Sequence, residues 1–136
     1  MPKTVLIVDN DNFSGKLVAD VLMSQDYRTL RTRDGHLVLD IARRHRPNLI
    51  VMDVKLPGIS GLDVARMLKG DPELRGIPII AVTASAQKED KERILAGGFD
   101  GYVFKPISVA NFLHSVNQTL APLNAAVVSR RRPLSN

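Results

Sequence analysis

The sequence contains no cysteine, and it has no long apolar run. The absence of cysteine excludes a disulfide framework, a thiolate metal site and a catalytic thiol. The apolar runs are no longer than a strand, so none of them could cross a bilayer. The first residues also lack the charged segment, the long apolar stretch and the cleavage site of a secretory signal. We therefore expect a cytoplasmic protein without a membrane span.

The sequence also has little excess charge outside its last residues. Three of its 19 lysines and arginines, Arg130, Arg131 and Arg132, lie within the last seven positions. Without these three, the formal net charge falls from +5 to +2, which is too small to predict binding to a polyanion. We therefore expect no direct contact with nucleic acid, and we interpret residues 122–136 as a basic, flexible tail. A role as an electrostatic tether is the alternative for this tail.

Three short segments predict buried strands. Residues 5–8, 49–52 and 79–82 are continuous apolar runs rich in β-branched side chains. Such runs are typical of central parallel strands that are covered on both faces. Residues 28–32 and 102–104 are more polar candidates, which belong at the edges of a sheet.

Apolar residues at helical spacing lie between the predicted strands and after the last one. The clearest pattern follows Ser108, a favourable N-cap residue, and consists of Val109, Phe112, Leu113, Val116 and Leu120. Alternating strands and helices predict a doubly wound α/β fold, because right-handed crossovers place helices on both faces of a parallel sheet. With the polar strands at the edges, we expect a five-stranded sheet in the order 2-1-3-4-5, a flavodoxin-like three-layer sandwich. We place this single domain at residues 1–121.

Polar residues directly follow four of the predicted strands. Asp9, Asp53, Thr83 and Lys105 come after the first, third, fourth and fifth strands. Because the carboxyl ends of parallel strands meet at one edge of a sheet, we expect these side chains to converge. Oxygen ligands without histidine or cysteine suit Mg²⁺, and an aspartate can accept a phosphoryl group covalently. An ammonium and a hydroxyl group nearby would stabilise the phosphoryl oxygens. The residues therefore predict a metal-assisted phosphoryl-transfer site.

These residues closely resemble the receiver domains of bacterial two-component response regulators. The resemblance covers about residues 4–120, and four segments carry it: Val5-Leu6-Ile7-Val8-Asp9, Met52-Asp53-Val54-Lys55-Leu56-Pro57 with Gly61, Ala81-Val82-Thr83-Ala84, and Lys105-Pro106. The stretches around Ile59-Ser60-Gly61-Leu62 and from Gly97 to Val109 are most similar to the single-domain DivK-like cell-cycle regulators. Each segment is a weak signal alone, but their order and their positions at strand ends make the set specific.

The resemblance implies roles for the acidic end of the site. Asp53 would accept a phosphoryl group from a histidine kinase or a phosphotransfer protein. Mg²⁺ would be held by Asp9, Asn10, Asp53 and the backbone carbonyl of Lys55. These assignments are expectations from the family pattern, applied to the matching positions of this sequence.

The resemblance also implies a switch. Thr83 and Lys105 would bind the phosphoryl group, and the bond between Lys105 and Pro106 would be cis. Tyr102 occupies the position of an aromatic residue that turns inward on activation and remodels the surface of the fourth helix, fifth strand and fifth helix. With no output domain expected, we expect the output to be contact with a protein partner. The surface residues expected to take part are Lys88, Lys91, Tyr102, Phe104, Asn111 and His114. We expect a monomer or a weak dimer.

One position departs from the family pattern, and two others are expected to influence the rate at which the phosphoryl group is lost. Asn10 stands where receivers normally carry a second acid, so we expect weaker Mg²⁺ binding than in a receiver with two acids. Asp11 could compensate, but its shifted position would aim its side chain elsewhere. Lys55 and Ser85 flank the path along which water would reach the phosphoryl group, so we expect them to tune dephosphorylation.

Other functions are possible for this type of sheet. Asn10 favours one alternative, a pseudo-receiver that acts as a binding module and signals without phosphorylation. A phosphatase of the haloacid-dehalogenase type would carry an acid two residues after its nucleophile, where this chain has Lys55. A flavodoxin-type flavin protein would need a hydroxyl- and glycine-rich loop where this chain has two acids. We therefore expect no enzyme activity beyond self-catalysed gain and loss of the phosphoryl group.

Overall fold

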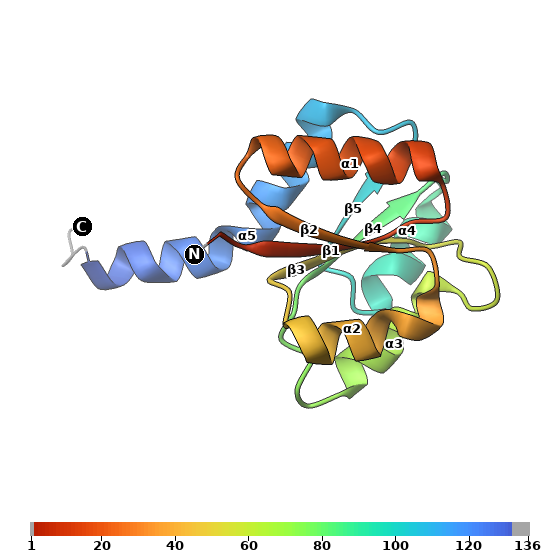
Figure 1. Cartoon of the computed structure of the whole chain (residues 1–136), viewed down its shortest axis with the longest axis horizontal. Helices are drawn as coiled ribbons and strands as arrows, with labels where there is room; N and C mark the ends of the chain where they lie inside the picture. Colours follow the sequence, from red (N-terminus) through yellow and green to blue (C-terminus); the bar gives the residue numbers. More distant parts are fainter. Residues whose placement is uncertain (1, 132–136) are drawn as a thin grey trace.

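The computed structural model describes the backbone of residues 2–131 and the side chains of residues 2–121. Strands and helices alternate along the chain (Figure 1). The strands are β1 (Thr4–Val8), β2 (Arg28–Thr32), β3 (Leu49–Asp53), β4 (Ile79–Thr83) and β5 (Gly101–Phe104). The helices are α1 (Asn12–Ser24), a 3-10 turn η1 (Gly35–Leu37), α2 (Val38–His45), α3 (Gly61–Gly70), α4 (Lys88–Ala96) and α5 (Val109–Arg131).

The five strands form one parallel sheet in the order β2-β1-β3-β4-β5. The predicted fold class and strand order are therefore confirmed. The central strands β1, β3 and β4 are almost wholly buried, whereas β2 and β5, at the two edges, are partly exposed. This distribution explains why the central strands are continuous apolar runs and the edge strands are more polar.

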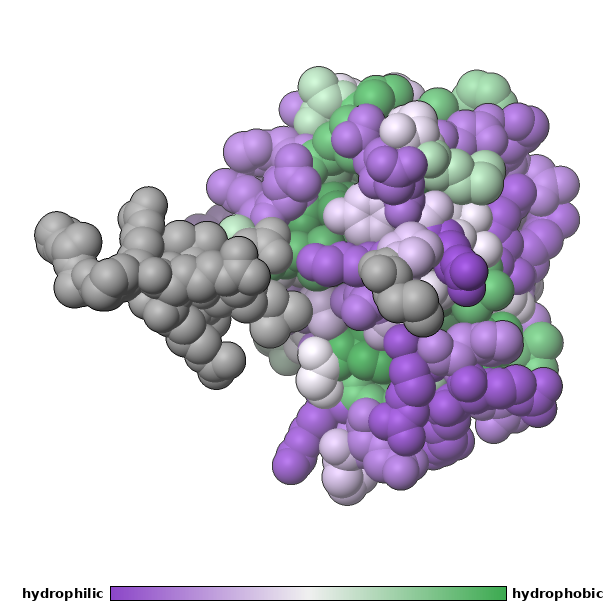
Figure 2. Space-filling model, turned by 60° about the vertical axis from the view of Figure 1, so that its left-hand side comes forward, coloured by the Kyte–Doolittle hydropathy of each residue, from purple (hydrophilic) through white to green (hydrophobic). Residues whose placement is uncertain are grey.

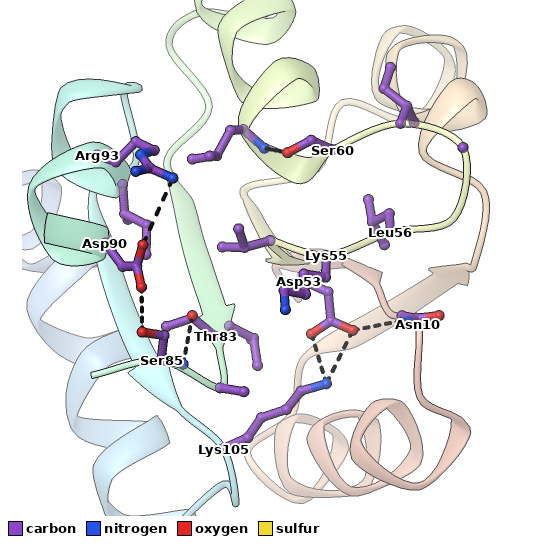
Figure 3. Close-up of a pocket in the computed structure, with 17 residues that line it drawn as sticks. Asn10, Asp53, Lys55, Leu56, Ser60, Thr83, Ser85, Asp90, Arg93 and Lys105 are labelled. Carbon is purple, nitrogen blue, oxygen red and sulfur yellow. Dashed lines mark hydrogen bonds and ion pairs between the residues drawn. The ribbon is translucent and has the colours of Figure 1, made fainter. Parts of the chain in front are cut away.

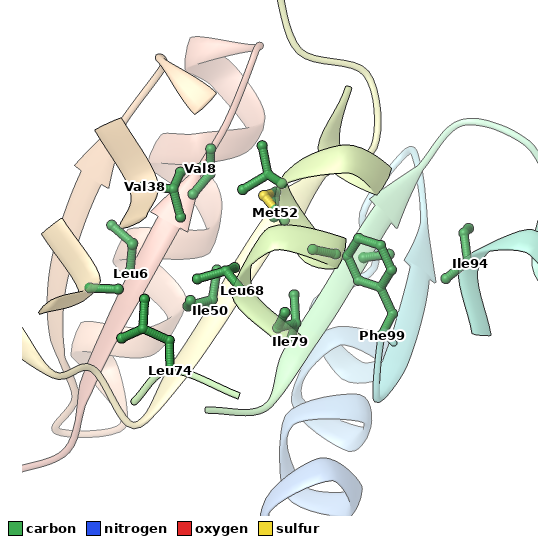
Figure 4. Packing of buried hydrophobic residues seen from close by; sticks show 14 residues of the cluster. Leu6, Val8, Val38, Ile50, Met52, Leu68, Leu74, Ile79, Ile94 and Phe99 are labelled. Atoms are coloured by element: carbon green, nitrogen blue, oxygen red, sulfur yellow. The ribbon is translucent and has the colours of Figure 1, made fainter. Parts of the chain in front are cut away.

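Two apolar clusters cover the two faces of the sheet. One cluster joins alternate strand residues such as Leu6 and Ile50 to α2, α3 and α4 (Figure 4). The other joins the intervening residues, such as Ile7 and Val51, to α1 and α5. Because successive strand side chains point to opposite faces, each central strand contributes to both clusters. The result is the three-layer arrangement visible in Figure 1.

Side-chain caps mark where several helices begin. The Ser108 hydroxyl accepts a hydrogen bond from the Asn111 N–H at 3.3 Å, as expected for the N-cap residue before α5. The Ser60 hydroxyl accepts one from the Leu62 N–H at 3.1 Å at the start of α3. Such caps satisfy backbone donors that have no partner within the helix.

The last helix extends past the predicted end of the domain. We expected the domain to end at residue 121, but α5 continues to Arg131. The side chains from residue 122 onward lie outside the described residues, so the flexible basic tail stays a prediction. Among the described residues, no helix is long and apolar enough to cross a membrane. Hydrophilic side chains dominate the molecular face in Figure 2, with smaller apolar patches between them.

Candidate functional site

The carboxyl ends of the strands meet at one edge of the sheet and surround an open pocket of about 1080 Å³ (Figure 3). Asp53 and Thr83 are the last residues of β3 and β4. Asp9 directly follows β1, and Lys105 directly follows β5. The topology therefore brings together residues that are far apart in the sequence.

Asp53 lies at the bottom of this pocket with only 4% of its surface exposed. The Lys105 ammonium lies 3.3 Å from its Oδ1 atom and 3.4 Å from its Oδ2 atom. The backbone N–H of Asn10 donates a hydrogen bond of 2.6 Å to Oδ2. A buried carboxylate is costly unless a cation and hydrogen bonds compensate its charge, and this one has both.

Asp9 is also buried, but its carboxylate is much less well satisfied. Only 4% of the residue is exposed, and neither oxygen accepts a hydrogen bond from any described residue. Burial raises the pKa of Asp9 above its ordinary value of 3.8, and the nearby charge of Arg31 opposes this effect. The Arg31 Nε atom lies 3.6 Å from Oδ2. Buried polar atoms without partners are rare, so this carboxylate is a candidate ligand for a cation.

Asp11 does not supply the missing acid. Its carboxylate is the N-cap of α1 and accepts hydrogen bonds from the Phe13 N–H at 3.0 Å and the Ser14 hydroxyl at 2.9 Å. The Ser14 and Phe13 hydrogen bonds lower the pKa of Asp11 below its ordinary value. Asp11, one residue after Asn10, therefore directs its side chain to the start of α1.

The oxygen atoms around the pocket suit a hard cation. The described residues include no group of three or more His, Cys, Asp and Glu side chains that could hold a metal. Asp53, Asn10 and Lys55 line the open pocket, and Asp9 lines a small second cavity that shares Asp53 with it. Mg²⁺ commonly uses one or two carboxylates and keeps several waters, so this donor set fits magnesium.

The hydroxyl of Thr83 is linked to the start of α4. Its Oγ1 atom accepts a hydrogen bond of 3.1 Å from the Ser85 N–H. The Ser85 hydroxyl in turn donates to the Asp90 carboxylate, which lies 3.9 Å from Arg93 (Figure 3). Ser85 is therefore part of the pocket wall, whereas the Lys55 side chain is exposed at the rim. The sequence did not predict the contacts of Asp90, because this residue lies within α4, does not follow a strand and belongs to no motif.

Tyr102 lies outside this pocket, on the edge strand β5. Its ring is half-buried, packs against the cluster shared with α2, α3 and α4, and lies 5.3 Å from the Phe104 ring. The Lys91 ammonium lies 5.3 Å from the centre of the Phe104 ring. The peptide bond between Lys105 and Pro106 is cis. Tyr102 and Phe104 also line a second groove of about 900 Å³, together with Asn111 and His114 of α5.

Two glycines let helices approach the acidic residues closely. A Cβ atom on Gly15 of α1 would overlap the Asp9 carboxylate. A Cβ atom on Gly61, the first residue of α3, would lie 2.9 Å from the Cα atom of Val54 and still closer to the carbonyl oxygen of Asp53. The Gly61 N–H also donates a 2.7 Å hydrogen bond to the Val54 carbonyl. Gly61 therefore fixes the backbone that carries Asp53.

Replacing Gly61 by alanine is expected to destabilise the protein by roughly 1–3 kcal/mol, the usual cost of overpacking a rigid site. The obstacle is backbone, which cannot move aside as a flexible side chain could. Urea unfolding of both chains measures the difference. Gly70→Ala is the matched control, because a Cβ atom there meets nothing within 4 Å. Equal unfolding midpoints for Gly61→Ala and the native chain would show that this contact is not tight.

Comparisons with known proteins agree with this arrangement. Residues 5–117 match the model of the response regulator receiver domain family. The polar-differentiation response regulator DivK of Brucella anthropi is 51% identical over 120 residues, which cover 88% of this chain and 98% of DivK.

Solved structures support the fold. The chemotaxis response regulator CheY4 of Vibrio cholerae has a TM-score of 0.83 at 24% identity, over 88% of this chain and all of that one. The receiver domain of the sensor histidine kinase PA1611 from Pseudomonas aeruginosa has a TM-score of 0.80 at 28% identity, over 89% and 99% of the two chains. That structure has a magnesium ion coordinated in its active-site cleft. From the family match and the identity to DivK, this chain belongs to the receiver domain family of two-component response regulators and is DivK-like.

Proposed function

We propose that this chain is a single-domain response regulator that accepts a phosphoryl group on Asp53. The donor would be the phosphohistidine of a histidine kinase or a phosphotransfer protein. The observation that carries the proposal is the buried Asp53 carboxylate, which Lys105 and the Asn10 N–H hold at the bottom of an open pocket. The partly compensated Asp9 carboxylate beside it supports a metal requirement.

The chemistry is a transfer between two nucleophiles. An Asp53 carboxylate oxygen attacks phosphorus and forms a P–O bond, while the P–N bond to the donor imidazole breaks and the imidazole keeps the electron pair. Lys105 stays beside Asp53 and offsets the negative charge of the phosphoryl oxygens. Bound to Asp9, Asp53, the Lys55 carbonyl and the Asn10 side chain, Mg²⁺ would supply further charge neutralisation. Loss of the group is hydrolysis of the acyl phosphate, and we propose that the chain turns over no other substrate.

The output would be a change at the groove along α4, β5 and α5. Thr83 can donate its hydroxyl proton to a phosphoryl oxygen if its side chain turns, which breaks the hydrogen bond from the Ser85 N–H. The Tyr102 ring is half-buried and lines the second groove, into which it could move. A protein partner that recognises the groove would then read the phosphorylated state. We propose that the chain acts as a monomer or weak dimer and without contact to nucleic acid.

Incubation with acetyl phosphate and Mg²⁺, followed by intact-mass measurement, tests this function. Acetyl phosphate supplies the phosphoryl group without a protein donor. We expect the native chain to gain one phosphoryl group and Asp53→Asn to gain none. The absence of an adduct on the native chain would instead favour the pseudo-receiver, for which Asn10 is the supporting feature.

Asn10 is also expected to weaken magnesium binding. It is exposed at the pocket and carries no charge, so Asn10→Asp would add a carboxylate beside Asp9 and Asp53. We expect Asn10→Asp to bind Mg²⁺ about three- to tenfold more tightly, because Coulomb attraction to a partly buried site is only partly screened. Isothermal titration calorimetry measures the affinities. Asn12→Asp, which adds the same charge at the start of α1, is the control, and equal affinities for Asn10→Asp and the native chain would contradict the prediction.

We infer further that Lys55 and Ser85 tune the lifetime of the phosphorylated state. Lys55 is exposed at the rim, where its ammonium can approach a phosphoryl group, and Ser85 is held in the wall by Asp90. Phosphate release from phosphorylated Lys55→Asn and native protein tests the role of Lys55. Identical release rates would remove Lys55 from this account.

A further inference from the structure

Arg31, a residue of the edge strand β2, lies beside the buried Asp9 carboxylate. It lies opposite Ile7 in the strand register, and its side chain extends along the face that α1 covers. Its Nε atom is 3.6 Å from Asp9 Oδ2, and its Nη2 atom is 3.5 Å from the Asn12 carbonyl oxygen. The Arg31 side chain therefore bridges the buried acid and the first residue of α1.

Each of the two buried carboxylates at the site has one cationic side chain beside it. Asp53 is paired with Lys105, and Asp9 is paired with Arg31. Asn10 adds no charge, and Asp11 is committed to the cap of α1. A cation that binds between Asp53 and Asp9 therefore meets one acid paired closely with Lys105 and a second whose charge Arg31 partly compensates.

The Arg31 pair is looser than the Lys105 pair. Its 3.6 Å separation does not satisfy Asp9 with a hydrogen bond, and 34% of the Arg31 side chain is exposed. Part of the Arg31 guanidinium is already in water, so it can leave Asp9 when a cation enters, at the cost of the attraction between the two charges. Arg33 makes a different contact, a 3.4 Å hydrogen bond from its guanidinium to the Asn10 carbonyl oxygen.

We propose that Arg31 is an internal counter-ion of Asp9 that competes with magnesium. Arg31 compensates the Asp9 charge in the metal-free protein, and its positive charge weakens magnesium binding beyond the effect of Asn10. This inference rests on the magnesium site of the proposed function and adds a residue that sets its affinity.

Nuclear magnetic resonance titrations with Mg²⁺ test the competition through the backbone amide shifts of Asp9, Asn10 and Asp53. We expect Arg31→Gln to bind Mg²⁺ about three- to tenfold more tightly than the native chain, because one positive charge leaves the site. Arg31→Lys keeps the charge and is expected to stay close to the native affinity. Arg28→Gln is the matched control, because Arg28 is an exposed arginine at the start of β2, opposite Thr4 and away from Asp9.

Thermal unfolding gives a second, independent test. Without metal, Arg31→Gln is expected to lower the unfolding temperature, because the Asp9 charge loses its compensation. The same substitution in the Asp9→Asn background is expected to have little effect. Equal Mg²⁺ affinities of Arg31→Gln and native protein would overturn this inference and leave the proposed function intact. If neither chain binds Mg²⁺, the metal site of the proposed function fails together with it.

Discussion

Asp9→Asn is expected to unfold at a higher temperature than the native chain when magnesium is absent. The Asp9 carboxylate is buried, and none of the described residues gives either oxygen a hydrogen bond. Burial outweighs the attraction of Arg31, so the pKa of Asp9 is raised in the folded protein. An acid with a raised pKa favours folding below its unfolded pKa and loses that contribution as the pH rises through the folded pKa. At neutral pH the ionised Asp9 therefore opposes folding, and a neutral amide removes this effect.

The pH and metal dependence make this prediction specific. The advantage of Asp9→Asn should be a few degrees at pH 7 and should vanish as the pH falls towards 3.8, the ordinary pKa of the carboxyl group. Added Mg²⁺ should raise the unfolding temperature of the native chain but not that of Asp9→Asn, because binding to the folded state alone stabilises it. Scanning calorimetry with and without Mg²⁺ measures both effects. A less stable Asp9→Asn chain at neutral pH without metal would contradict this account.

Lys105→Met is expected to slow both the gain and the loss of the phosphoryl group, each by about tenfold or more. The Lys105 ammonium lies within 3.4 Å of both Asp53 oxygens, so it is placed to stabilise charge on a phosphoryl group in transit. Loss of one such preorganised group commonly costs about 10²–10³ in rate where it acts directly on the reacting atoms. Gain and loss slow together because both pass through a charged phosphoryl group beside Asp53.

The rates are measured by intact mass after addition of acetyl phosphate with Mg²⁺, and then after its removal. Lys16→Met is the matched control, because Lys16 is an exposed lysine of α1 that pairs with Asp20. The folded state of Lys105→Met is checked by circular dichroism, since the buried Asp53 carboxylate loses its paired cation in this variant. Unchanged rates in a folded Lys105→Met chain would show that Lys105 has no direct role in the transfer.

The sheet was predictable because its sequence signals are local. Each central strand is a short β-branched run, and the more polar strands lie at the edges, where water reaches them. The convergence of Asp9, Asp53, Thr83 and Lys105 followed from the strand order alone, because parallel strands place their carboxyl ends together. The α/β pattern therefore carried most of the information about the site.

The contacts that were not foreseen depend on register and on side-chain direction. Arg31 reaches Asp9 only because β2 pairs with β1 so that Arg31 lies opposite Ile7. Asp90 reaches the Ser85 hydroxyl through the geometry of the loop before α4. The helix α5 continues past Leu120, where the apolar pattern that indicated this helix ends. Such features depend on tertiary structure and leave no periodic signal in the sequence.

The position of the phosphoryl group shows which side chain accepts it. Borohydride reduces an acyl phosphate to an alcohol, so a phosphorylated aspartate becomes homoserine and can be located by peptide mass spectrometry. After treatment with acetyl phosphate and Mg²⁺, we expect homoserine at position 53 and at no other acid. Homoserine at Asp9 or Asp11, or an unmodified Asp53 in protein that has gained a phosphoryl group, would contradict it.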